Sequence, residues 1–356
     1  MRKITINTSA NTTASILIIY TGGTIGMVYD EKYQNLVPFD VEIILKQVPE
    51  LRLLEYAITV ISFEPEQLID SSNIKPHHWF EVARIIQENY ALFDGFVILH
   101  GTDTMAYTAS VLSFLFKNLQ KPVILTGAQL PIGAIRNDAR RNLITSIQIA
   151  AAKRNGLPIV PEVCIFFNDF LLRGNRSRKV ENIHFDAFHS ANYPHLAQVG
   201  INITYNEAAI MPIQLPLQNE LEVQFALDEN IAILKLFPAI RAEMIKHFLE
   251  IPNLKAVVLE TYGAGNAPTD KWFIDLLRQG IEKGIVIFNV SQCIGGVVIQ
   301  GKYATSRLLK EIGVLSGADL TTEAAVSKLM YLLAQNLPKE TFEYQLTHSL
   351  RGEMRT

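Results

Sequence analysis

Short apolar runs alternate with amphipathic stretches along most of the chain. Residues 16–20 (ILIIY), 95–99 (GFVIL), 122–126 (PVILT) and 163–167 (VCIFF) form such runs. Continuous, β-branched runs of about five residues are typical of strands that are buried on both faces of a sheet. Between them, residues 77–91, 105–119 and 138–153 show a helical period. Strands that alternate with helices predict an α/β fold with a mostly parallel, mixed sheet flanked by helices.

The same alternation continues in the C-terminal third of the chain. Residues 231–237, 254–260 and 284–290 predict strands, and residues 267–284 predict a helix. A chain of 356 residues usually forms two domains. Residues 201–220 have little helical period and many polar turn residues. We therefore expect four parts, namely a disordered polar arm (1–15), a larger N-terminal domain (16–200), a linker (201–220) and a smaller C-terminal α/β domain (221–356).

The composition excludes several classes of protein. With 32 Lys+Arg, 35 Asp+Glu and a net charge of -3, the chain has no strong positive field, so nucleic acid and anionic membranes are not expected partners. No hydrophobic run reaches the length that a bilayer requires. The N-terminus has no apolar core of a secretory signal. Cys164 and Cys293 are far apart and form no CxxC pair, which favours a reducing cytoplasm over a disulfide or zinc framework.

The first predicted strand ends in the sequence TGGT, residues 21–24. Two glycines allow a sharp turn and a close approach of the backbone to a ligand. The turn could hold a phosphate, present the hydroxyl of Thr24 as a nucleophile, or have no chemical role. The phosphate-binding patterns GxGxxG and GxxxxGK[ST] are absent. Taken alone, the motif favours a plain turn.

A second polar motif, HGTDT (residues 100–104), follows the strand at 95–99. Thr104 stands where the next helix begins, and threonine is a favoured N-cap residue. Asp103 could bind the ammonium group of a ligand, and Thr102 could position or activate a water molecule. His100 precedes a glycine, and we expect it to bridge backbone groups.

Two further segments carry candidate residues. Asp70, Ser71 and Ser72 precede a helix; a solvated turn is their simplest interpretation, and capture of an α-carboxylate is the functional one. The basic stretch RGNRSRK (residues 173–179) follows a strand, so one lysine could point inward. A buried lysine can act as a base. Lys179 is the candidate, although composition alone does not choose it over Arg178.

The set of motifs is more informative than any one of them. YTGGTIGM, IDSSN, HGTDTMAYTAS, PVILTGAQLP, RGNRSRK and YGAGNAP occur in the order seen in L-asparaginases of the bacterial cytosolic kind. The resemblance extends from about residue 16 to residue 351. No HExxH metal motif and no GxSxG serine elbow is present.

The resemblance implies an amidohydrolase that converts L-asparagine and water to L-aspartate and ammonia through an acyl-enzyme. It implies Thr24 as the nucleophile and a Thr-Lys-Asp group made of Thr102, Lys179 and Asp103. The substrate α-groups would bind to Asp70, Ser71 and Ser72, with Thr102 and Asp103 beside them. No metal or organic cofactor is implied, and the protein would act in the cytoplasm as a homodimer or homotetramer.

Two family positions have less clear counterparts. The family places a tyrosine on a loop after TGGT, where alignment on Pro38 gives Leu36, and Tyr29 and Tyr33 are close but out of step. The family's C-terminal domain also lends a residue to a neighbouring subunit, for which Asn266 is the match.

Three alternatives remain open from the sequence. L-glutamine differs from asparagine by one methylene and could be a slower substrate. An amidotransferase subunit that supplies ammonia for tRNA amidation has the same catalytic core but a sizeable extra N-terminal domain, whereas about fifteen residues precede the first apolar run here. A non-catalytic amino-acid sensor would retain the fold and bind asparagine without hydrolysing it.

Overall fold

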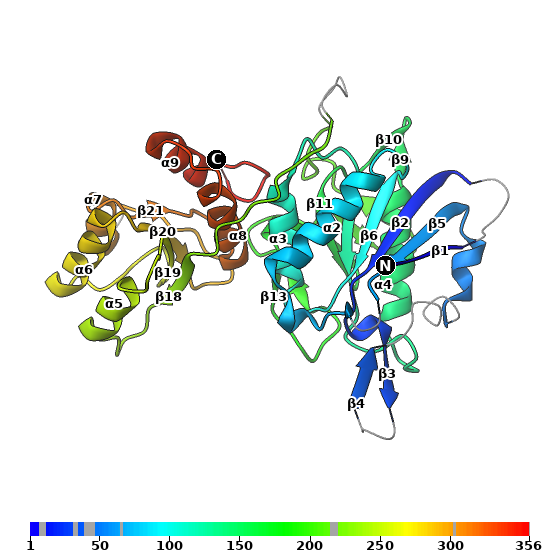
Figure 1. Ribbon diagram of the computed structural model, residues 1–356, viewed down its shortest axis with the longest axis horizontal. Coiled ribbons are helices and arrows are strands. Elements are labelled where there is room, and N and C mark those ends of the chain that lie inside the picture. Colours follow the sequence, from blue (N-terminus) through cyan, green and yellow to red (C-terminus); the bar gives the residue numbers. More distant parts are fainter. Residues whose placement is uncertain are drawn as a thin grey trace. The chain divides into compact units, whose positions relative to one another are not determined.

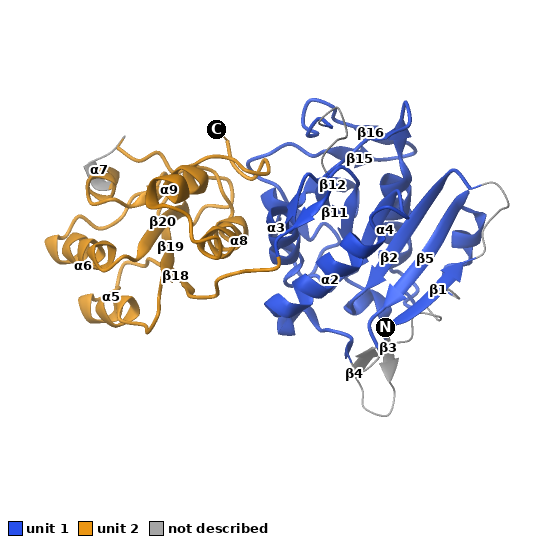
Figure 2. Cartoon of the chain, turned by 45° about the horizontal axis from the view of Figure 1, so that its top comes forward, with its two compact units in different colours: residues 1–224 blue, residues 225–356 orange. Residues whose placement is uncertain are grey.

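The structure is a computed structural model that describes residues 1–6, 12–30, 35–38, 47–64, 67–213, 220–301 and 304–355. The chain divides into two compact units, Met1–Gln224 and Phe225–Thr356 (Figure 2). Each unit has its own sheet and its own apolar core. The predicted two-domain α/β fold, with a larger N-terminal and a smaller C-terminal domain, is confirmed.

A nine-stranded sheet in the order β1-β5-β2-β6-β8-β11-β12-β15-β16 forms the centre of unit 1 (Figure 1). Its middle is parallel and consists of β5 (Tyr56–Ser62), β2 (Ala14–Tyr20), β6 (Gly95–Leu99), β8 (Val123–Thr126) and β11 (Val163–Phe167). Antiparallel strands complete both edges, with β1 (Arg2–Ile6) on one side and β12 (Phe170–Arg173), β15 (Ala197–Val199) and β16 (Ile203–Tyr205) on the other. The sheet is therefore mixed, as predicted, with its parallel strands in the interior.

The predicted helices of unit 1 are α2 (Pro76–Asn89), α3 (Met105–Leu115) and α4 (Ala139–Ala151). Successive side chains of β2 point to opposite faces of the sheet, yet Leu17 and Ile18 are both buried, so apolar groups cover both faces. Helix α4 packs on the face that carries Ile18. Helix α3 ends earlier than predicted, because Phe116–Lys117 is strand β7, which pairs with β17 (Glu222–Val223).

Three short hairpins project from this framework. They are β3 (Met27–Asp30) with β4 (Asn35–Pro38), β9 (Lys153–Arg154) with β10 (Leu157–Pro158), and β13 (Arg178–Lys179) with β14 (Phe188–His189). The first follows the TGGT turn and the third contains the candidate lysine, so both belong to segments that the sequence singled out.

Unit 2 has a four-stranded parallel sheet, β18 (Ile231–Lys235), β19 (Ala256–Thr261), β20 (Val286–Ser291) and β21 (Leu315–Ser316). Its helices are α5 (Ala242–Leu249), α6 (Lys271–Glu282), α7 (Ala304–Glu311), α8 (Thr322–Leu333) and α9 (Lys339–Thr347). Phe273 and Leu277 lie one turn apart on α6 and are fully buried in the core of this unit.

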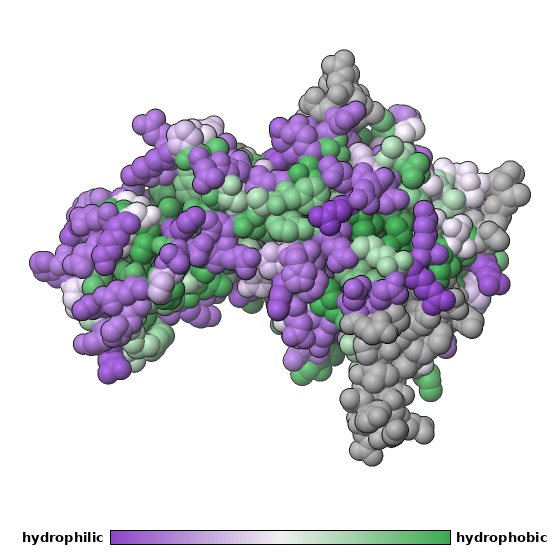
Figure 3. All heavy atoms as spheres, in the orientation of Figure 1, coloured by the Kyte–Doolittle hydropathy of each residue, from purple (hydrophilic) through white to green (hydrophobic). Residues whose placement is uncertain are grey.

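Hydrophilic residues cover most of the visible face of unit 2 (Figure 3). On the exposed side of α6, Asp275 forms ion pairs with Lys271 and Arg278, as residues three and four positions apart on a helix can do. Within the described part of the chain, no helix combines the length and the hydropathy that crossing a membrane would need.

Two expectations about boundaries are corrected. Residues Arg2–Ile6 of the expected disordered arm form β1, because they pair with β5 along the edge of the sheet. The expected linker at 201–220 contains β16, which pairs with β15, so the chain stays in unit 1 as far as Gln224. Residues 7–11 and 214–219, which belong to the expected arm and linker, lie outside the described residues.

Candidate active site

Two neighbouring parallel strands bring the TGGT and HGTDT motifs together. Strands β2 and β6 pair in register up to Tyr20 and Leu99, so the residues that follow them emerge at the same edge of the sheet. Thr21 prolongs the contact, since its backbone N–H and its hydroxyl both donate to the Leu99 carbonyl oxygen, at 3.1 and 2.9 Å. The first two motifs therefore start side by side.

The backbones of these motifs then touch. Gly23 has φ +89°, and a Cβ on it would lie 2.5 Å from the Gly101 nitrogen. Gly22 has φ +125°, and its Cβ would lie 2.4 Å from the Ile69 carbonyl oxygen. Real Cβ contacts are longer than this, so only glycine allows the two turns to approach so closely. The glycines thus serve packing between motifs as well as turning.

Thr24 begins a single turn of 3-10 helix, Thr24–Gly26, directly after Gly23. The turn is closed by the hydroxyl of Tyr20, which donates to the Gly26 carbonyl oxygen at 3.2 Å. The loop after β8 also reaches this turn, because the Ile132 N–H donates to the Ile25 carbonyl oxygen at 3.4 Å. Thr24 is partly exposed, while Ile25 and Gly26 behind it are buried.

The Asp70–Ser72 segment packs against both motifs. The Ile69 N–H donates to the Thr21 carbonyl oxygen at 2.8 Å, and a Cβ on Gly101 would lie 2.5 Å from the Ser71 hydroxyl. Thr104 is the N-cap of α3, but its hydroxyl does not cap the helix and instead donates to the Ser71 carbonyl oxygen at 2.7 Å.

Within this segment, the exposed Asp70 carboxylate accepts hydrogen bonds from the Ser72 N–H and hydroxyl, at 3.0 and 2.9 Å. Asp70 thereby caps the short helical turn that begins at Ser71, which is the buried residue of the three. The segment is therefore a capped turn at the rim of the site.

Lys179 reaches the HGTDT motif from strand β13. Its Nζ donates to the Thr102 hydroxyl at 2.8 Å and lies 2.6 Å from an Asp103 carboxylate oxygen. The Lys179 side chain is 17% exposed and the Asp103 side chain 63% exposed, so the cation is largely enclosed and its carboxylate partner faces solvent. Composition alone did not choose between Lys179 and Arg178, whereas the family resemblance implied Lys179, and the structure directs Lys179 towards Thr102.

A buried ion pair supports the chain that leads to Lys179. Arg173, at the end of β12, bonds to Glu162 at 2.6 Å, and the two side chains are 4% and 3% exposed. After it, the chain makes a tight turn in which Gly174 packs against Ala109 of α3. The Ser177 hydroxyl then donates to the Arg173 carbonyl oxygen at 2.7 Å. These contacts fix the path of the backbone before the lysine.

His100 lies beneath the second motif and is 2% exposed. Its Nδ1 is 2.7 Å from the Gly101 carbonyl oxygen, and its Nε2 is 2.9 Å from the Thr108 hydroxyl. The Thr108 hydroxyl also accepts a hydrogen bond from the Trp79 indole N–H at 2.9 Å. Burial lowers the pKa of His100 from 6.5 to about 4, because the low-dielectric interior disfavours the charged imidazole. His100 bonds to one backbone group and one side chain, where the sequence predicted a bridge between backbone groups.

The structure gathers most of the predicted site residues in unit 1. Glycine contacts, strand pairing and direct hydrogen bonds place these at one edge of the sheet: Thr24, Asp70, Ser71, Ser72, Thr102, Asp103 and Lys179. Sequence reasoning missed Tyr20, Thr108 and Trp79, which support the motifs from behind. In the sequence, the glycines within the polar motifs were the one signal that the motif backbones pack closely. They did not reveal which side chains support the motifs from behind.

Other predicted positions are not tested by this arrangement. The backbone positions of Tyr29 and Leu36 are register partners in β3 and β4, and Tyr33 lies outside the described residues. Asn266 lies in unit 2, where its backbone closes a tight turn with Tyr262. Among the described residues, no group of three or more His, Cys, Asp or Glu side chains could hold a metal ion.

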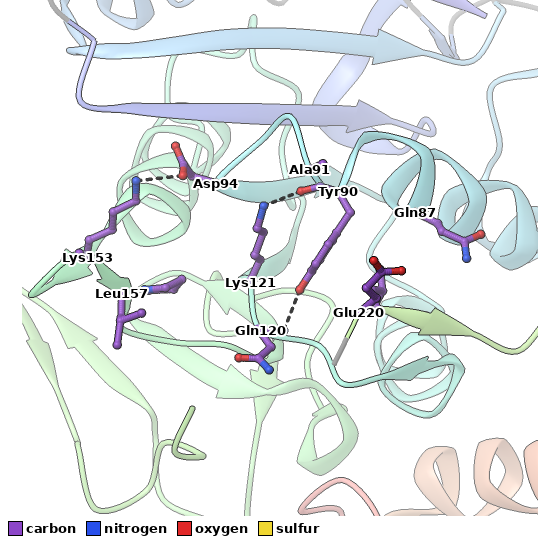
Figure 4. Close-up of a pocket in the computed structure, with 12 residues that line it drawn as sticks. Gln87, Tyr90, Ala91, Asp94, Gln120, Lys121, Lys153, Leu157 and Glu220 are labelled. Atoms are coloured by element: carbon purple, nitrogen blue, oxygen red, sulfur yellow. Dashed lines mark hydrogen bonds and ion pairs between the residues drawn. The ribbon is translucent and has the colours of Figure 1, made fainter. Parts of the chain in front are cut away.

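A cavity of about 660 Å³ lies at the opposite end of the parallel strands (Figure 4). It is lined by Asp94 and Lys121, which precede β6 and β8, and by Tyr90 after α2. Lys121 donates to the Tyr90 and Phe93 carbonyl oxygens, and Asp94 pairs with Lys153 at 2.9 Å. None of the predicted site residues lines this cavity. Because its lining includes the segments that precede β6 and β8, and the motifs follow those strands, we do not place the chemistry there.

Comparisons with known proteins identify the family of both units. A family model described as "Asparaginase, N-terminal" matches residues 15–211, and one described as "Glutaminase/Asparaginase C-terminal domain" matches residues 230–345. The two matches fall within the two units of the structure.

Three individual proteins illustrate the similarity. L-asparaginase 1 of Escherichia coli (strain K12) is 42% identical, and the match covers 96% of this chain and 98% of that protein. The 60 kDa lysophospholipase of Mus musculus is 39% identical, with 95% of this chain and 62% of that protein covered. The crystal structure of L-asparaginase I from Vibrio cholerae superposes with a TM-score of 0.85 at 40% identity, covering 96% of this chain and 99% of that one.

The contact between the glycine turns predicts a specific sensitivity to an added methyl group. Gly156→Ala places alanine at φ +81° with no atom within 4 Å of its Cβ. Only backbone strain in the left-handed region should then lower the free energy of unfolding, by about 1–2 kcal/mol. Gly23→Ala adds the clash with the Gly101 backbone to a similar strain, so it should destabilise unit 1 by more. Denaturant unfolding of both variants tests this, and equal losses of stability would contradict it.

Burial of His100 predicts a dependence of stability on pH. The unfolded imidazole binds a proton below about pH 6.5, and the folded one does so only near pH 4, so the free energy of unfolding should fall by about 3 kcal/mol over that interval as the pH decreases. Unfolding measured between about pH 4.5 and 7 should show a shallower decline in His100→Asn than in wild type. The exposed His184→Asn serves as control. Identical declines in wild type and His100→Asn would contradict the prediction.

Proposed function

The chain belongs to the asparaginase family of hydrolases, and on this premise we propose that it converts L-asparagine and water to L-aspartate and ammonia with Thr24 as its nucleophile. The observation that carries the proposal is the contact of Lys179 with both Thr102 and Asp103, beside the glycine turn that presents Thr24. Three distant segments of the chain supply these groups. A cation enclosed next to a hydroxyl is an arrangement suited to proton transfer.

The proposed reaction begins with attack of the Thr24 hydroxyl on the side-chain carboxamide of the substrate. A threonine hydroxyl is a weak nucleophile until a base takes its proton. Lys179 in its uncharged form is that base, acting directly or through a water molecule, and Asp103 stabilises the ammonium that results. Backbone N–H groups of the glycine turn stabilise the tetrahedral oxyanion, where each donor contributes about a hundredfold in rate.

The intermediate collapses as the Lys179 ammonium returns its proton to the leaving nitrogen, which releases ammonia and leaves an acyl-enzyme that water hydrolyses to L-aspartate. The substrate α-ammonium and α-carboxylate bind to Asp70, Ser71 and Ser72, with Thr102 and Asp103 beside them. This assignment is supported by the packing of Ser71 against Gly101, which puts the segment at the edge of the same site. The steps draw on side chains and backbone of the protein alone.

Asparagine is proposed as the preferred substrate and glutamine as a slower one. The two differ by one methylene, which a pocket discriminates by about 1–3 kcal/mol. We further propose a homodimer or homotetramer, in which Asn266 would serve a neighbouring subunit, and action in a reducing cytoplasm, where the free thiols of Cys164 and Cys293 persist.

Ammonia release from free asparagine separates this proposal from the alternatives. The purified chain should release ammonia from L-asparagine without tRNA or a partner protein. An amidotransferase subunit would require those partners for full activity. Tight binding of asparagine without ammonia release would instead identify a sensor and would refute the proposed reaction.

Removal of the Thr24 hydroxyl should abolish turnover without unfolding the protein. Loss of a nucleophile lowers kcat by more than about a thousandfold in comparable hydrolases. Thr24 is partly exposed, so Thr24→Ala should retain the thermal stability of wild type. Thr24→Ser keeps a hydroxyl and should retain measurable turnover. Near-normal ammonia release by Thr24→Ala would remove Thr24 from this role.

Lys179 should affect the chemical step more than substrate binding. General acid–base groups contribute about 10²–10⁴-fold, so Lys179→Met should lower kcat within that range while KM changes far less. Arg178→Met is the matched control, because it removes the adjacent cation of the same strand and should leave kcat near that of wild type. Equal kcat values for the two variants would make Lys179 an ordinary structural cation.

A further inference from the structure

The hydrogen bonds around His100 have a fixed direction. An indole N–H can only donate, so Trp79 donates to the Thr108 hydroxyl. A carbonyl oxygen can only accept, so His100 Nδ1 must carry the proton in its 2.7 Å bond to Gly101. In a neutral imidazole, Nε2 is then an acceptor, and it receives the proton of the Thr108 hydroxyl at 2.9 Å. The contacts therefore fix both the tautomer of His100 and the rotation of the Thr108 hydroxyl.

This chain of bonds ends on a peptide group of the candidate active site. The Gly101 carbonyl belongs to the planar peptide that also contains the Thr102 N–H. Gly101 has no Cβ, and its backbone lies against Gly23 on one side and Ser71 on the other. Glycine has more backbone freedom than any other residue, so contacts with neighbouring groups must fix the orientation of this peptide. The Nδ1–H of His100 supplies that restraint.

We propose that His100 is a positioning residue, whose Nδ1–H holds the Gly101–Thr102 peptide so that Thr102 is presented to Lys179 and to the Thr24 turn. The inference rests on the proposed function of Thr102. Thr108 in α3 bonds to the imidazole, and Trp79 in α2 bonds to Thr108. Side chains from two helices therefore fix the orientation of the imidazole and, through it, of one peptide plane. His100 itself does not touch the substrate or exchange protons with it.

A simpler role, in which His100 merely fills a buried site, would predict a different response to mutation. If His100 only fills space, its substitution should lower the free energy of unfolding and leave kcat per folded molecule unchanged. A positioning residue affects kcat per folded molecule, because misplacement of a reacting group by about 1 Å costs about a hundredfold. The two roles are therefore separable by measuring kcat and the folded fraction together.

The experiment compares two substitutions of His100 in the full-length protein. His100→Asn keeps an N–H close to the place of Nδ1 and should retain most of kcat, whereas His100→Leu has no donor and should lose about a hundredfold in kcat per folded molecule with a smaller change in KM. Equal kcat in wild type and His100→Leu would overturn the proposal. So would a loss that the unfolded fraction fully explains.

A second variant keeps the test informative if His100→Leu does not fold. Thr108→Val preserves the shape of the side chain but removes the hydroxyl that holds Nε2, so kcat should fall by more than in Ser113→Ala. Ser113 is a suitable control because its buried hydroxyl, on the same helix, bonds only to the Ala109 carbonyl oxygen at 2.7 Å among the bonds described. Equal kcat values in these two variants would count against the proposal.

Nitrogen-15 NMR of labelled histidine gives a readout that does not depend on activity. The spectrum should show one imidazole protonated at Nδ1 with Nε2 unprotonated, and His100→Asn should remove that signal. A His100 signal protonated at Nε2 would overturn the proposal even in an active enzyme. Failure of wild type to hydrolyse asparagine, with the predicted tautomer present, would refute the proposed function and leave the geometry of His100 intact.

Discussion

The close contact between the backbones of Gly23 and Gly101 is the constraint on which the site depends. Two parallel strands place their ends one strand spacing apart, but side chains normally keep the loops that follow them from touching. A Cβ on Gly23 would be 2.5 Å from the Gly101 nitrogen, and a Cβ on Gly101 would be 2.5 Å from the Ser71 hydroxyl, so glycine at both positions lets the three segments meet directly. Thr24 and Thr102, each one residue further along the chain, are thereby brought into one region of unit 1.

The structure supports that contact with buried polar bonds rather than with apolar packing alone. Trp79, Thr108 and His100 form a directed chain behind the HGTDT motif, and the Arg173–Glu162 ion pair holds the strand from which the lysine segment departs. A buried polar group without a partner is costly, so such bonds fix orientation in a way that apolar side chains do not.

Four of the five parallel strands of the large sheet were predicted from the sequence, whereas the parallel strand β5 and the antiparallel strands were not. Strands β2, β6, β8 and β11 were predicted because strands buried on both faces need continuous apolar runs. The antiparallel strands β1, β12, β15 and β16 are short or half-exposed, and their mixed sequences resemble loops. For this reason the arm at the N-terminus and the linker after residue 200 were assigned wrongly in part.

The sequence by itself determined the α/β alternation, the two units and the motifs at strand ends, because these depend on local patterns of apolar, glycine and hydroxyl residues. Only the tertiary structure showed that Lys179, which the motif set had already singled out, contacts Thr102 and Asp103, since that contact depends on how the short strands β13 and β14 pack beside the second motif. It likewise decided the partners of His100, which come from α2 and α3. Contacts between distant segments are set by how the elements pack, and no local pattern of residues records them.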